Sequence, residues 1–317
     1  MPELPEVQTT VNGINKYASG RKIVAVWSDY RSDFYVGKNN IKDPHYFKAF
    51  ERRVKDSTIV KAERRAKHIL IHLSNQETVL VHMKMTGHFL YGNFDYKRSQ
   101  KKWQPPTGYW NKSWPQSKEQ AIKENPFSDP FNDFIHLVFV LDNEKQLAFS
   151  DMRKFASISV MKAAEARALI ENMYGPEPLD PQTSPEIFIA SLQKKPNMNI
   201  KTALLDQSLI AGFGNIYSDE TLWAASVHPE SKVGAIPTKV FMQIYHEGKK
   251  VLQKALRHGG DSMGDYRTIE GKSGDFQNLH NVYKQEGKVC SKCGSVIEKK
   301  LINQRVGRFC PHHQKRY

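Results

Sequence analysis

Cysteine is almost absent from this 317-residue sequence: there are three, and none precedes Cys290. No cysteine can therefore staple the main body, and an odd number in one short tract favours metal ligation over disulfides. The sequence also lacks any run of about 18 apolar residues and any apolar signal segment after its start, which argues against a transmembrane or secreted protein. Internal repeats and low-complexity segments are absent too. We expect an intracellular protein, cytoplasmic or associated with the nucleoid.

Positive charge dominates what is present. Lys and Arg total 47 against 33 Asp and Glu, which gives a formal net charge of +14 and a pI of about 9.5. Such an excess favours a polyanionic partner, and nucleic acid is the usual one, although a membrane surface is a competing interpretation. Hydrophobic residues make up 39%, so a substantial core can form. The length suits two modest domains and a small appendage.

The sequence begins Met-Pro-Glu-Leu-Pro-Glu, and this stretch carries a candidate nucleophile. If Met1 is removed, the Pro2 nitrogen becomes a secondary amine with a reference pKa of about 7.7–8.0, so part of it is unprotonated near neutral pH. Such an amine can attack an electrophilic sugar carbon and form an iminium, or Schiff-base, intermediate. Glu3 could supply the proton that a leaving or ring oxygen needs, and Glu6 adds a second carboxylate. Taken alone, these residues also fit a disordered terminus.

The first half of the chain predicts a helix followed by many short strands. Apolar residues at helical spacing from Val7 to Tyr17 indicate a helix that ends near Gly20, and a second helical segment covers 46–53. Strand-like runs bounded by polar turns occupy 22–28, 58–62, 68–73, 78–83, 136–141, 146–149 and 156–160. This pattern is typical of an antiparallel β-sandwich. A long loop over 91–133, rich in Lys, Pro and Asn, interrupts it and holds Trp103, Trp110 and Trp114.

A proline-rich linker at 175–181 ends the first domain, which spans 1–174. Beyond it we expect helices at 185–194, 199–206, 216–226 and 236–258, with Ser184 as an N-cap before Pro185. A polar, glycine-containing loop at 259–277 completes a second domain over 182–283. Residues 284–317 form a cysteine-bearing tail. The expected fold class is therefore α+β.

The tail holds two pairs of metal-ligand residues. Cys290 and Cys293 form a CxxC pair, and Cys310 with His313 forms a CxxH pair after sixteen intervening residues. Three thiolates and one imidazole make a tetrahedral ligand set typical of structural zinc. His312 is an alternative fourth ligand, although the two-residue spacer favours His313. Four protein ligands leave no open position, so we expect one Zn²⁺ that folds the tail and does not catalyse.

Glycines mark two further segments. Gly294 and Gly307 suit a β-hairpin between the ligand pairs, which would present basic side chains to phosphates: Lys299, Lys300, Arg305 and Arg308. Gly212 and Gly214 allow a tight turn before a helix that begins near Asn215. Free backbone N–H groups at such a helix start can hold a phosphate, with Asn215 as a further donor. A glycine-rich turn that holds no ligand is an equally good interpretation.

Together these motifs resemble the formamidopyrimidine-DNA glycosylase and endonuclease VIII family of base-excision repair enzymes, and they are closer to its formamidopyrimidine-DNA glycosylase branch. The resemblance rests on Pro2-Glu3, on the helix–two-turn–helix stretch ending at 214–217 and on the C-terminal zinc finger. It covers nearly the whole chain except 91–133. It implies a β-sandwich domain with flanking helices, a helix–two-turn–helix domain with its lesion-recognition loop at 259–277, and a zinc-finger hairpin.

The same resemblance implies an activity. The chain would be a monomeric DNA glycosylase and apurinic/apyrimidinic-site lyase that acts on damaged double-stranded DNA. It would excise oxidised purines (8-oxoguanine, formamidopyrimidines) through an N-terminal proline Schiff base and cut the strand by β,δ-elimination. In this comparison Pro2 matches the nucleophile and Glu3 the acid that assists base loss and sugar-ring opening. Lys67 and Arg305 match phosphate-binding residues of the catalytic set.

The resemblance also implies a set of DNA-binding residues: Glu6, Met85, Arg153, Phe155, Asn215 and Tyr283. Met85 matches the residue that fills the gap left by the flipped base, Arg153 the arginine that pairs with the orphaned base, and Phe155 an aromatic wedge. Asn215 matches a phosphate-binding asparagine. Without the resemblance, Met85 and Phe155 would be interpreted as core residues.

The sequence departs from the family pattern at several positions. The fourth zinc ligand is a histidine and not a cysteine, Lys84 replaces a glycine before Met85, and Phe134 replaces a histidine. Gly264 stands in the lesion-recognition loop where arginine is common. Two alternatives therefore remain: an endonuclease VIII-like glycosylase for oxidised pyrimidines, and a non-catalytic DNA-binding protein on the same scaffold.

Overall fold

The computed structural model describes residues 1–97, 99–104, 122 and 124–317. The chain divides into two compact units. The first comprises residues 1–2, 6–169 and 259–274, and the second comprises residues 3–5, 170–258 and 275–317. Both the start of the chain and the segment after residue 258 therefore supply residues to each unit.

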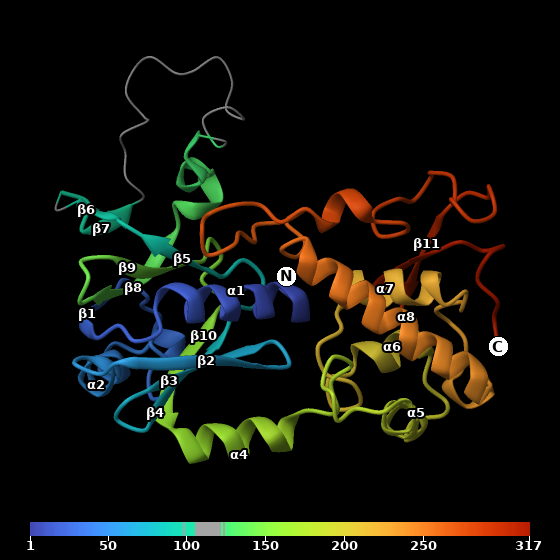
Figure 1. Ribbon diagram of the computed structural model, residues 1–317, viewed down its shortest axis with the longest axis horizontal. Coiled ribbons are helices and arrows are strands. Elements are labelled where there is room, and N and C mark those ends of the chain that lie inside the picture. The colour runs from blue at the N-terminus through green and yellow to red at the C-terminus, as the bar shows by residue number, and fades with distance from the viewer. Residues whose placement is uncertain (98, 105–121, 123) are drawn as a thin grey trace. The chain divides into compact units, whose positions relative to one another are not determined.

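Two four-stranded antiparallel sheets build the first unit (Figure 1). One has the order β1-β8-β9-β5, with bounds Ile23–Ser28, Ile135–Leu141, Gln146–Ser150 and His88–Gly92. The other has the order β10-β4-β3-β2, with bounds Ser157–Lys162, Glu77–His82, His68–Leu73 and Ile59–Arg65. A shared hydrophobic core includes Val81, Phe89, Leu137 and Phe149. The predicted α+β class with an N-terminal β-sandwich is confirmed.

Two helices flank this sandwich. Helix α1 (Leu4–Tyr17) contributes an apolar stripe to the core, as its sequence spacing predicts: Val7, Val11 and Ile14. Helix α2 (Pro44–Val54) starts at a capping residue, because the Asp43 carboxylate accepts the His45 N–H at 2.8 Å. Pro44 at the first helical position costs nothing there, since that N–H would have no helical partner.

Some elements are not predicted by the sequence pattern. Helix α4 (Ala163–Met173) follows β10 directly and buries only Ala166 and Ile170, so its apolar stripe is too narrow to detect. The expected 91–133 loop begins inside β5 and contains a short hairpin of β6 (Asp95–Lys97) and β7 (Lys102–Gln104). Two 3-10 turns, Pro126–Ser128 and Pro130–Asn132, lie near its end. Trp103 lies in β7, whereas Trp110 and Trp114 fall outside the described residues.

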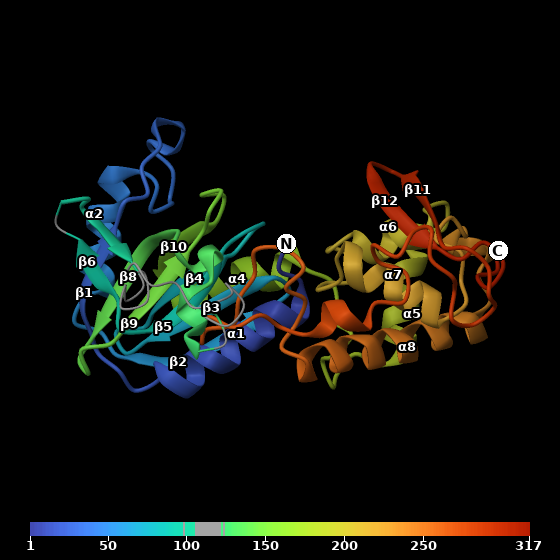
Figure 2. The same cartoon turned by 90° about the horizontal axis from the view of Figure 1, so that it is seen from above.

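The second unit is mainly helical (Figure 2). Its helices lie close to the predicted ranges: α5 (Pro185–Gln193), α6 (Ile200–Leu205), α7 (Asn215–Ala224) and α8 (Thr238–Arg257). Ser184 caps α5 and accepts the Ile187 N–H at 3.3 Å. The core of the unit includes fully buried Phe188, Leu204 and Phe241.

The C-terminal hairpin pairs β11 (Glu298–Ile302) with β12 (Arg305–Phe309). Its two turn residues, Asn303 and Gln304, have φ of 43° and 65°. Left-handed conformations at both positions match the type I′ turn, whose twist suits two-residue hairpins. The predicted hairpin is therefore present, but Asn-Gln makes its turn, while Gly307 lies within β12, where a Cβ would come 2.9 Å from Ile302 Cδ1.

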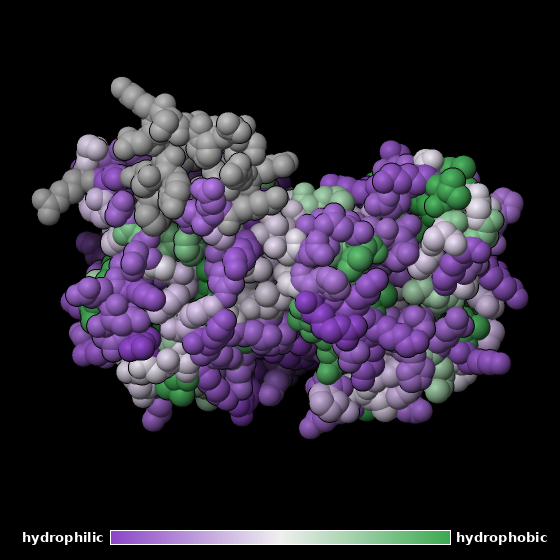
Figure 3. Space-filling view, turned by 45° about the horizontal axis from the view of Figure 1, so that its top comes forward, coloured by the Kyte–Doolittle hydropathy of each residue, from purple (hydrophilic) through white to green (hydrophobic). Residues whose placement is uncertain are grey.

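Hydrophilic side chains predominate among the described residues on the face drawn in Figure 3. Within the described residues, no helix combines the length and apolar character needed to cross a membrane.

Candidate active site and nucleic-acid interface

The Glu3 carboxylate sits at the N-terminus of α7. It is 2% exposed and accepts the backbone N–H groups of Ile216 at 3.1 Å and Tyr217 at 3.4 Å. The sequence leaves open whether these donors hold a phosphate or belong to a turn without a ligand, and two of them are occupied by the protein's own carboxylate. Gly214 permits this close approach, since a Cβ there would lie 2.2 Å from Glu3 Cδ. The absence of a side chain at Gly214 thus lets the carboxylate that follows Pro2 in the chain reach the start of α7.

Pro2 and Glu6, the other residues of the N-terminal motif, are buried. Glu6 is 2% exposed, and its carboxylate accepts the Asp261 N–H at 2.8 Å. The Tyr266 hydroxyl donates to the Glu6 carbonyl at 3.1 Å. Gly260 has φ of 84° and also lies against Glu6, where a Cβ would come 2.7 Å from Oε1. Glu6, predicted as a DNA-binding residue, is placed here to hold the 259–274 loop within the first unit.

The three predicted duplex-inserting residues lie together. Met85 is 41% exposed and Phe155 is 48% exposed, although both are apolar. The Arg153 guanidinium bridges them, with Nη1 3.1 Å from Met85 Sδ and Cζ 4.5 Å from the Phe155 ring centroid. Exposed apolar side chains clustered with an arginine suit insertion into a base stack better than a core role.

Asp151 holds this cluster in place and is not singled out by the sequence. It is fully buried. Its carboxylate accepts the Tyr30 hydroxyl at 2.9 Å, the Ala156 N–H at 2.9 Å and a short hydrogen bond from the Thr86 hydroxyl. The Thr86 oxygen in turn accepts the Arg153 N–H at 3.1 Å. A carboxylate with three donors therefore ties the two loops that carry the inserting residues.

Both of these loops contain a lysine in the left-handed region of backbone conformation. Lys84, which precedes Met85, has φ of 56°, and Lys154, which precedes Phe155, has φ of 53°. Glycine adopts such a conformation without steric cost, which accounts physically for the family's glycine at the position of Lys84. The two loops therefore keep this conformation with side chains that add positive charge.

Lys67 lies in the turn between β2 and β3 and is 8% exposed. The rings of His68 and His82 stand beside it in an edge-to-face pair with centroids 4.6 Å apart. Burial, with a contribution from Lys84, lowers the pKa of His68 to about 4. Burial together with His68, Lys84 and Lys67 lowers the pKa of His82 to about 3. Near neutral pH both histidines are therefore neutral and add no positive charge beside Lys67.

In the second unit, Asn215 and Tyr283 meet. Asn215 is the first residue of α7. Burial raises the pKa of Tyr283, and a hydrogen bond with the Asn215 side chain opposes that shift. The Arg308 guanidinium lies 4.6 Å from the Tyr283 ring centroid. Arg305 is exposed at the turn end of β12.

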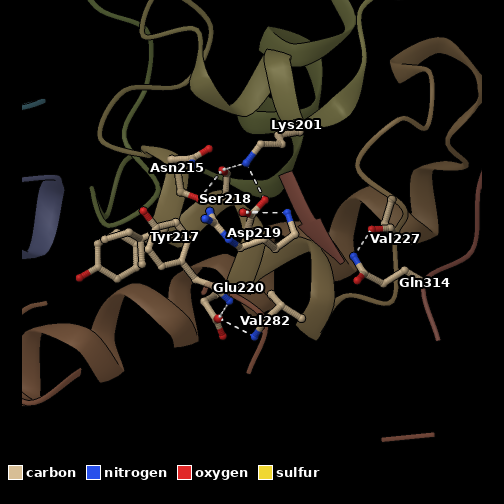
Figure 4. Close-up of polar contacts among 12 residues, drawn as sticks. Lys201, Asn215, Tyr217, Ser218, Asp219, Glu220, Val227, Val282 and Gln314 are labelled. Carbon is tan, nitrogen blue, oxygen red and sulfur yellow. Dashed lines mark hydrogen bonds and ion pairs between the residues drawn. The ribbon is translucent and has the colours of Figure 1, made fainter. Parts of the chain in front are cut away.

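Two further carboxylates of α7 position this region, and the sequence does not mark either. Glu220 accepts the N–H groups of Asn281, Val282 and Tyr283 at 2.9–3.0 Å. Asp219 forms an ion pair with Lys201 and accepts the Arg308 N–H at 3.1 Å. Figure 4 shows Lys201 and Asp219 pointing toward each other, with Glu220 beside Val282. Each carboxylate could be mistaken in the sequence for a solvated helix charge.

The three tail cysteines gather with all their sulfurs within 4.8 Å of one another. A tetrahedral zinc with Zn–S bonds of about 2.3 Å needs sulfurs about 3.8 Å apart, so this cluster fits the ion. His313 lies outside the cluster as described. Its Nε2 lies 3.1 Å from the Trp223 carbonyl and its backbone N–H donates to Cys310 Sγ at 3.3 Å. That carbonyl selects the tautomer protonated at Nε2, which leaves Nδ1 for a metal.

Comparisons with known proteins agree with this geometry. Residues 1–158 match the family model of the formamidopyrimidine-DNA glycosylase N-terminal domain, and residues 174–267 match that of the formamidopyrimidine-DNA glycosylase H2TH domain. A formamidopyrimidine-DNA glycosylase from Herpetosiphon aurantiacus is 32% identical over 311 residues, covering 98% of each chain. One from Protochlamydia amoebophila is 32% identical over 321 residues and covers 100% of both chains.

The fold is also similar to that of solved structures. The Lactococcus lactis Fpg in a complex with abasic-site DNA superimposes with a TM-score of 0.78 at 26% identity, covering 99% of this chain and 100% of that one. The same protein in a complex with Fapy-dG-containing DNA gives a TM-score of 0.76 at 27% identity, with the same coverage. The chain therefore belongs to the formamidopyrimidine-DNA glycosylase family of DNA-repair glycosylases.

Proposed function

We propose that this protein excises oxidised purines from duplex DNA and then cuts the strand, with the Pro2 amine as nucleophile after removal of Met1. The observation that carries the proposal is the anchored carboxylate of Glu3, buried on two N–H donors of α7 and adjacent in sequence to Pro2. A pure binding protein needs no carboxylate fixed next to an N-terminal secondary amine. The Lactococcus lactis relative, solved in complexes with abasic-site DNA and with Fapy-dG-containing DNA, supports the substrate class.

The chemistry follows from these two groups. The Pro2 nitrogen attacks C1′ of the damaged nucleotide, the C1′–base bond breaks, and Glu3 delivers a proton that assists base loss and ring opening. The product is an iminium between Pro2 and C1′. This cation acidifies the C2′–H bond, and loss of that proton expels the 3′-phosphate. The conjugated iminium that results acidifies the C4′–H bond, and loss of this second proton expels the 5′-phosphate. Water finally hydrolyses the iminium and restores the amine.

A base inside a duplex is unreachable, so the nucleotide must be flipped out, which costs a few kcal/mol. Met85, Arg153 and Phe155 are placed together and exposed, and in this proposal they fill the gap that the nucleotide leaves.

Lys67, Asn215, Tyr283 and Arg305 bind the DNA backbone. A structural zinc on Cys290, Cys293, Cys310 and His313 holds the tail in its folded form and takes no part in the chemistry.

Borohydride trapping tests the proposal, because the reagent reduces an iminium to a stable amine. Native protein incubated with an abasic or 8-oxoguanine duplex should become covalently attached, with the adduct on residue 2 by mass spectrometry. The decisive control keeps a residue in front of Pro2, which turns its nitrogen into a non-nucleophilic amide. If that control still traps DNA, another amine is the nucleophile, and Lys67 is the first to examine. If native protein traps no lesion, a non-catalytic DNA-binding protein becomes the better account.

The preferred lesion separates the remaining alternatives. Faster excision of oxidised pyrimidines than of 8-oxoguanine from matched duplexes would favour an endonuclease VIII-like specificity. The Met85, Arg153 and Phe155 set and Leu4 resemble the formamidopyrimidine branch, which supports oxidised purines.

A further inference from the structure

An open pocket of about 670 Å³ lies in the first unit beside the inserting residues. One wall consists of residues 30–32, Phe34, Tyr35 and Lys42, and the other includes Lys84 and residues 153–155. Its lining combines exposed aromatic rings with cationic side chains and includes no carboxylate. Neither the proposed chemistry nor the sequence motifs use the first of these walls.

Lys42 is the residue that most strongly indicates that the pocket binds an anion. It is 3% exposed. Within the described residues its ammonium makes one hydrogen bond, a long one of 3.5 Å to the Tyr35 hydroxyl, and lies 4.5 Å from the Tyr35 ring centroid and 5.8 Å from that of Tyr30. No carboxylate of the described residues forms an ion pair with it. Burial lowers the pKa of Lys42, Asp151 opposes that shift and Lys84 adds to it. A buried ammonium without a paired carboxylate gains most from an anion bound in the pocket it lines.

Aromatic rings provide the second signal. Phe34 is 73% exposed, more than any other large hydrophobic side chain among the described residues. The Lys38 ammonium lies 3.5 Å from the centroid of the Phe34 ring. It covers only one face of that ring with positive charge. Phe155 adds a second exposed ring to the same pocket. Exposed rings among cations are the usual platform for unstacked bases, and stacking tolerates any sequence.

Hydrogen bonds to β10 hold the segment that carries Phe34 in place. The Ile41 N–H donates to the Ile158 carbonyl at 3.0 Å, and the Asn40 amide donates to Ser157 Oγ at 3.1 Å. Both partners belong to β10, next to the loop that ends in Phe155. The Asp43 carboxylate closes the segment by accepting the Gly37 N–H at 2.9 Å. The pocket therefore exists before any ligand arrives.

We propose that this pocket binds a nucleotide of the undamaged strand, with its phosphate against Lys42 and Arg31 and its base on Phe34. The proposal rests on the proposed function, in which Arg153 and Phe155 enter the duplex opposite the flipped nucleotide. Since both residues line the same pocket, the strand nearest to it is the one that keeps the orphaned base. The site would hold that strand while the damaged nucleotide is out of the helix.

Salt-dependent binding tests the phosphate contact. The variants are Lys42→Met and, because Lys42 is buried, the exposed Arg31→Gln as a second variant that leaves the core intact. Lys48→Gln on the exposed side of α2 is the matched control. With a duplex that carries an uncleavable abasic-site analogue, each pocket variant should bind about tenfold more weakly, with a salt slope smaller by about 1. Native affinity and slope in both pocket variants would overturn the proposal.

Fluorescence assigns the strand. The fluorescence of a 2-aminopurine in the undamaged strand next to the orphaned base should change when native protein binds, and should change much less with Phe34→Leu. A Phe34-dependent change only when the probe is in the damaged strand would overturn the assignment. Titration with dGMP tests whether the ligand is a free nucleotide. The strand assignment would also be overturned if dGMP binds saturably, Lys42→Met abolishes that binding, and the same variant binds duplex DNA like native protein.

One further measurement keeps the two proposals apart. Native protein is trapped with borohydride on a single-stranded abasic oligonucleotide, which has no undamaged strand. If it traps there while the pocket variants bind duplex like native protein, the pocket proposal alone is wrong. If native protein traps neither single-stranded nor duplex abasic DNA, the proposed function is wrong, whatever the pocket binds.

Discussion

Lys201 and Asp219 form an ion pair that is wholly removed from solvent: Nζ lies 2.5 Å from Oδ1, and both side chains are 0% exposed. The second oxygen of Asp219 accepts the Arg308 N–H at 3.1 Å. Burial raises the pKa of Asp219 to about 6 and lowers that of Lys201. The pair thus joins α6, α7 and β12, and α7 is also the helix whose first turn holds Glu3. Through this pair, the finger hairpin is attached to the element that anchors the candidate acid.

Removing one partner of this pair should be costly. Lys201→Met leaves Asp219 buried without its cation, so we expect the free energy of unfolding to fall by about 3–5 kcal/mol in urea denaturation. The double variant Lys201→Met with Asp219→Leu removes both charges and should recover much of that loss. A double variant less stable than Lys201→Met alone would contradict this account.

Gly214→Ala should act on catalysis through Glu3. The added Cβ would lie 2.2 Å from Glu3 Cδ and must displace the carboxylate. Excision of 8-oxoguanine should fall by about 100-fold or more, the range expected for loss of a general acid, as it should for Glu3→Gln. Cleavage of a ready-made abasic site should fall less, because the base is already gone. Equal losses on both substrates would show that the change acts elsewhere.

Phe155→Ala tests insertion into the duplex. Replacing one stacked ring should weaken excision from a stable duplex by about 1–3 kcal/mol of activation free energy. A lesion placed opposite a mismatch or an abasic site costs less to open, so the effect should shrink there. Single-turnover rates on matched duplexes make the comparison, and an equal loss on all of them would argue against a wedge.

Metal analysis should find about one zinc per chain, and Cys290→Ser should lose both the zinc and DNA binding. His313→Ala should lose the metal and His312→Ala should keep it, because the Trp223 carbonyl holds His313 by Nε2 and leaves its Nδ1 available. Full DNA affinity in a zinc-free protein would refute the structural role. If His312→Ala loses the zinc and His313→Ala keeps it, His312 is the fourth ligand in place of His313.

Acid should weaken the first unit through His88. Burial lowers the pKa of this histidine to about 4, although hydrogen bonds to Asn132 and Thr86 oppose the shift. The unfolded chain binds the proton near pH 6.5 and the folded chain only near pH 4, so stability falls across that window as the pH decreases. The loss approaches about 3 kcal/mol. His88→Gln should remove this share of the pH dependence and leave the shares of His68 and His82, whose pKa values burial also lowers. An unchanged profile would contradict the assignment.

The sequence predicts what depends on local pattern. β3 is predicted with its correct bounds, because a run of apolar and branched residues between turns needs a strand. The CxxC and CxxH pairs likewise predict a metal site from spacing alone. Helix α4 escapes prediction because it buries so few side chains.

Contacts between distant residues are not visible in the sequence. Glu3 binds backbone N–H groups 213 and 214 residues away, and such donors leave no side-chain signature. The roles of Asp151, Lys201 and Glu220 have the same origin, since each depends on partners that the fold brings together. The backbone conformation of Lys84 is also hidden from the sequence, for a different reason. A left-handed residue is ordinarily glycine, so a lysine gives no sign of this conformation.

The wide separation of Glu3 and Glu6 from their partners has a consequence for biosynthesis. Ribosomes build the chain from its amino end, so Glu3 is made 213 residues before Ile216, and Glu6 is made 255 residues before Asp261. Until those partners emerge, neither carboxylate can take its final position. A nascent or truncated chain that ends before α7 therefore carries the N-terminal motif without its anchors. The N-terminal motif reaches its final position only when most of the polypeptide has been translated.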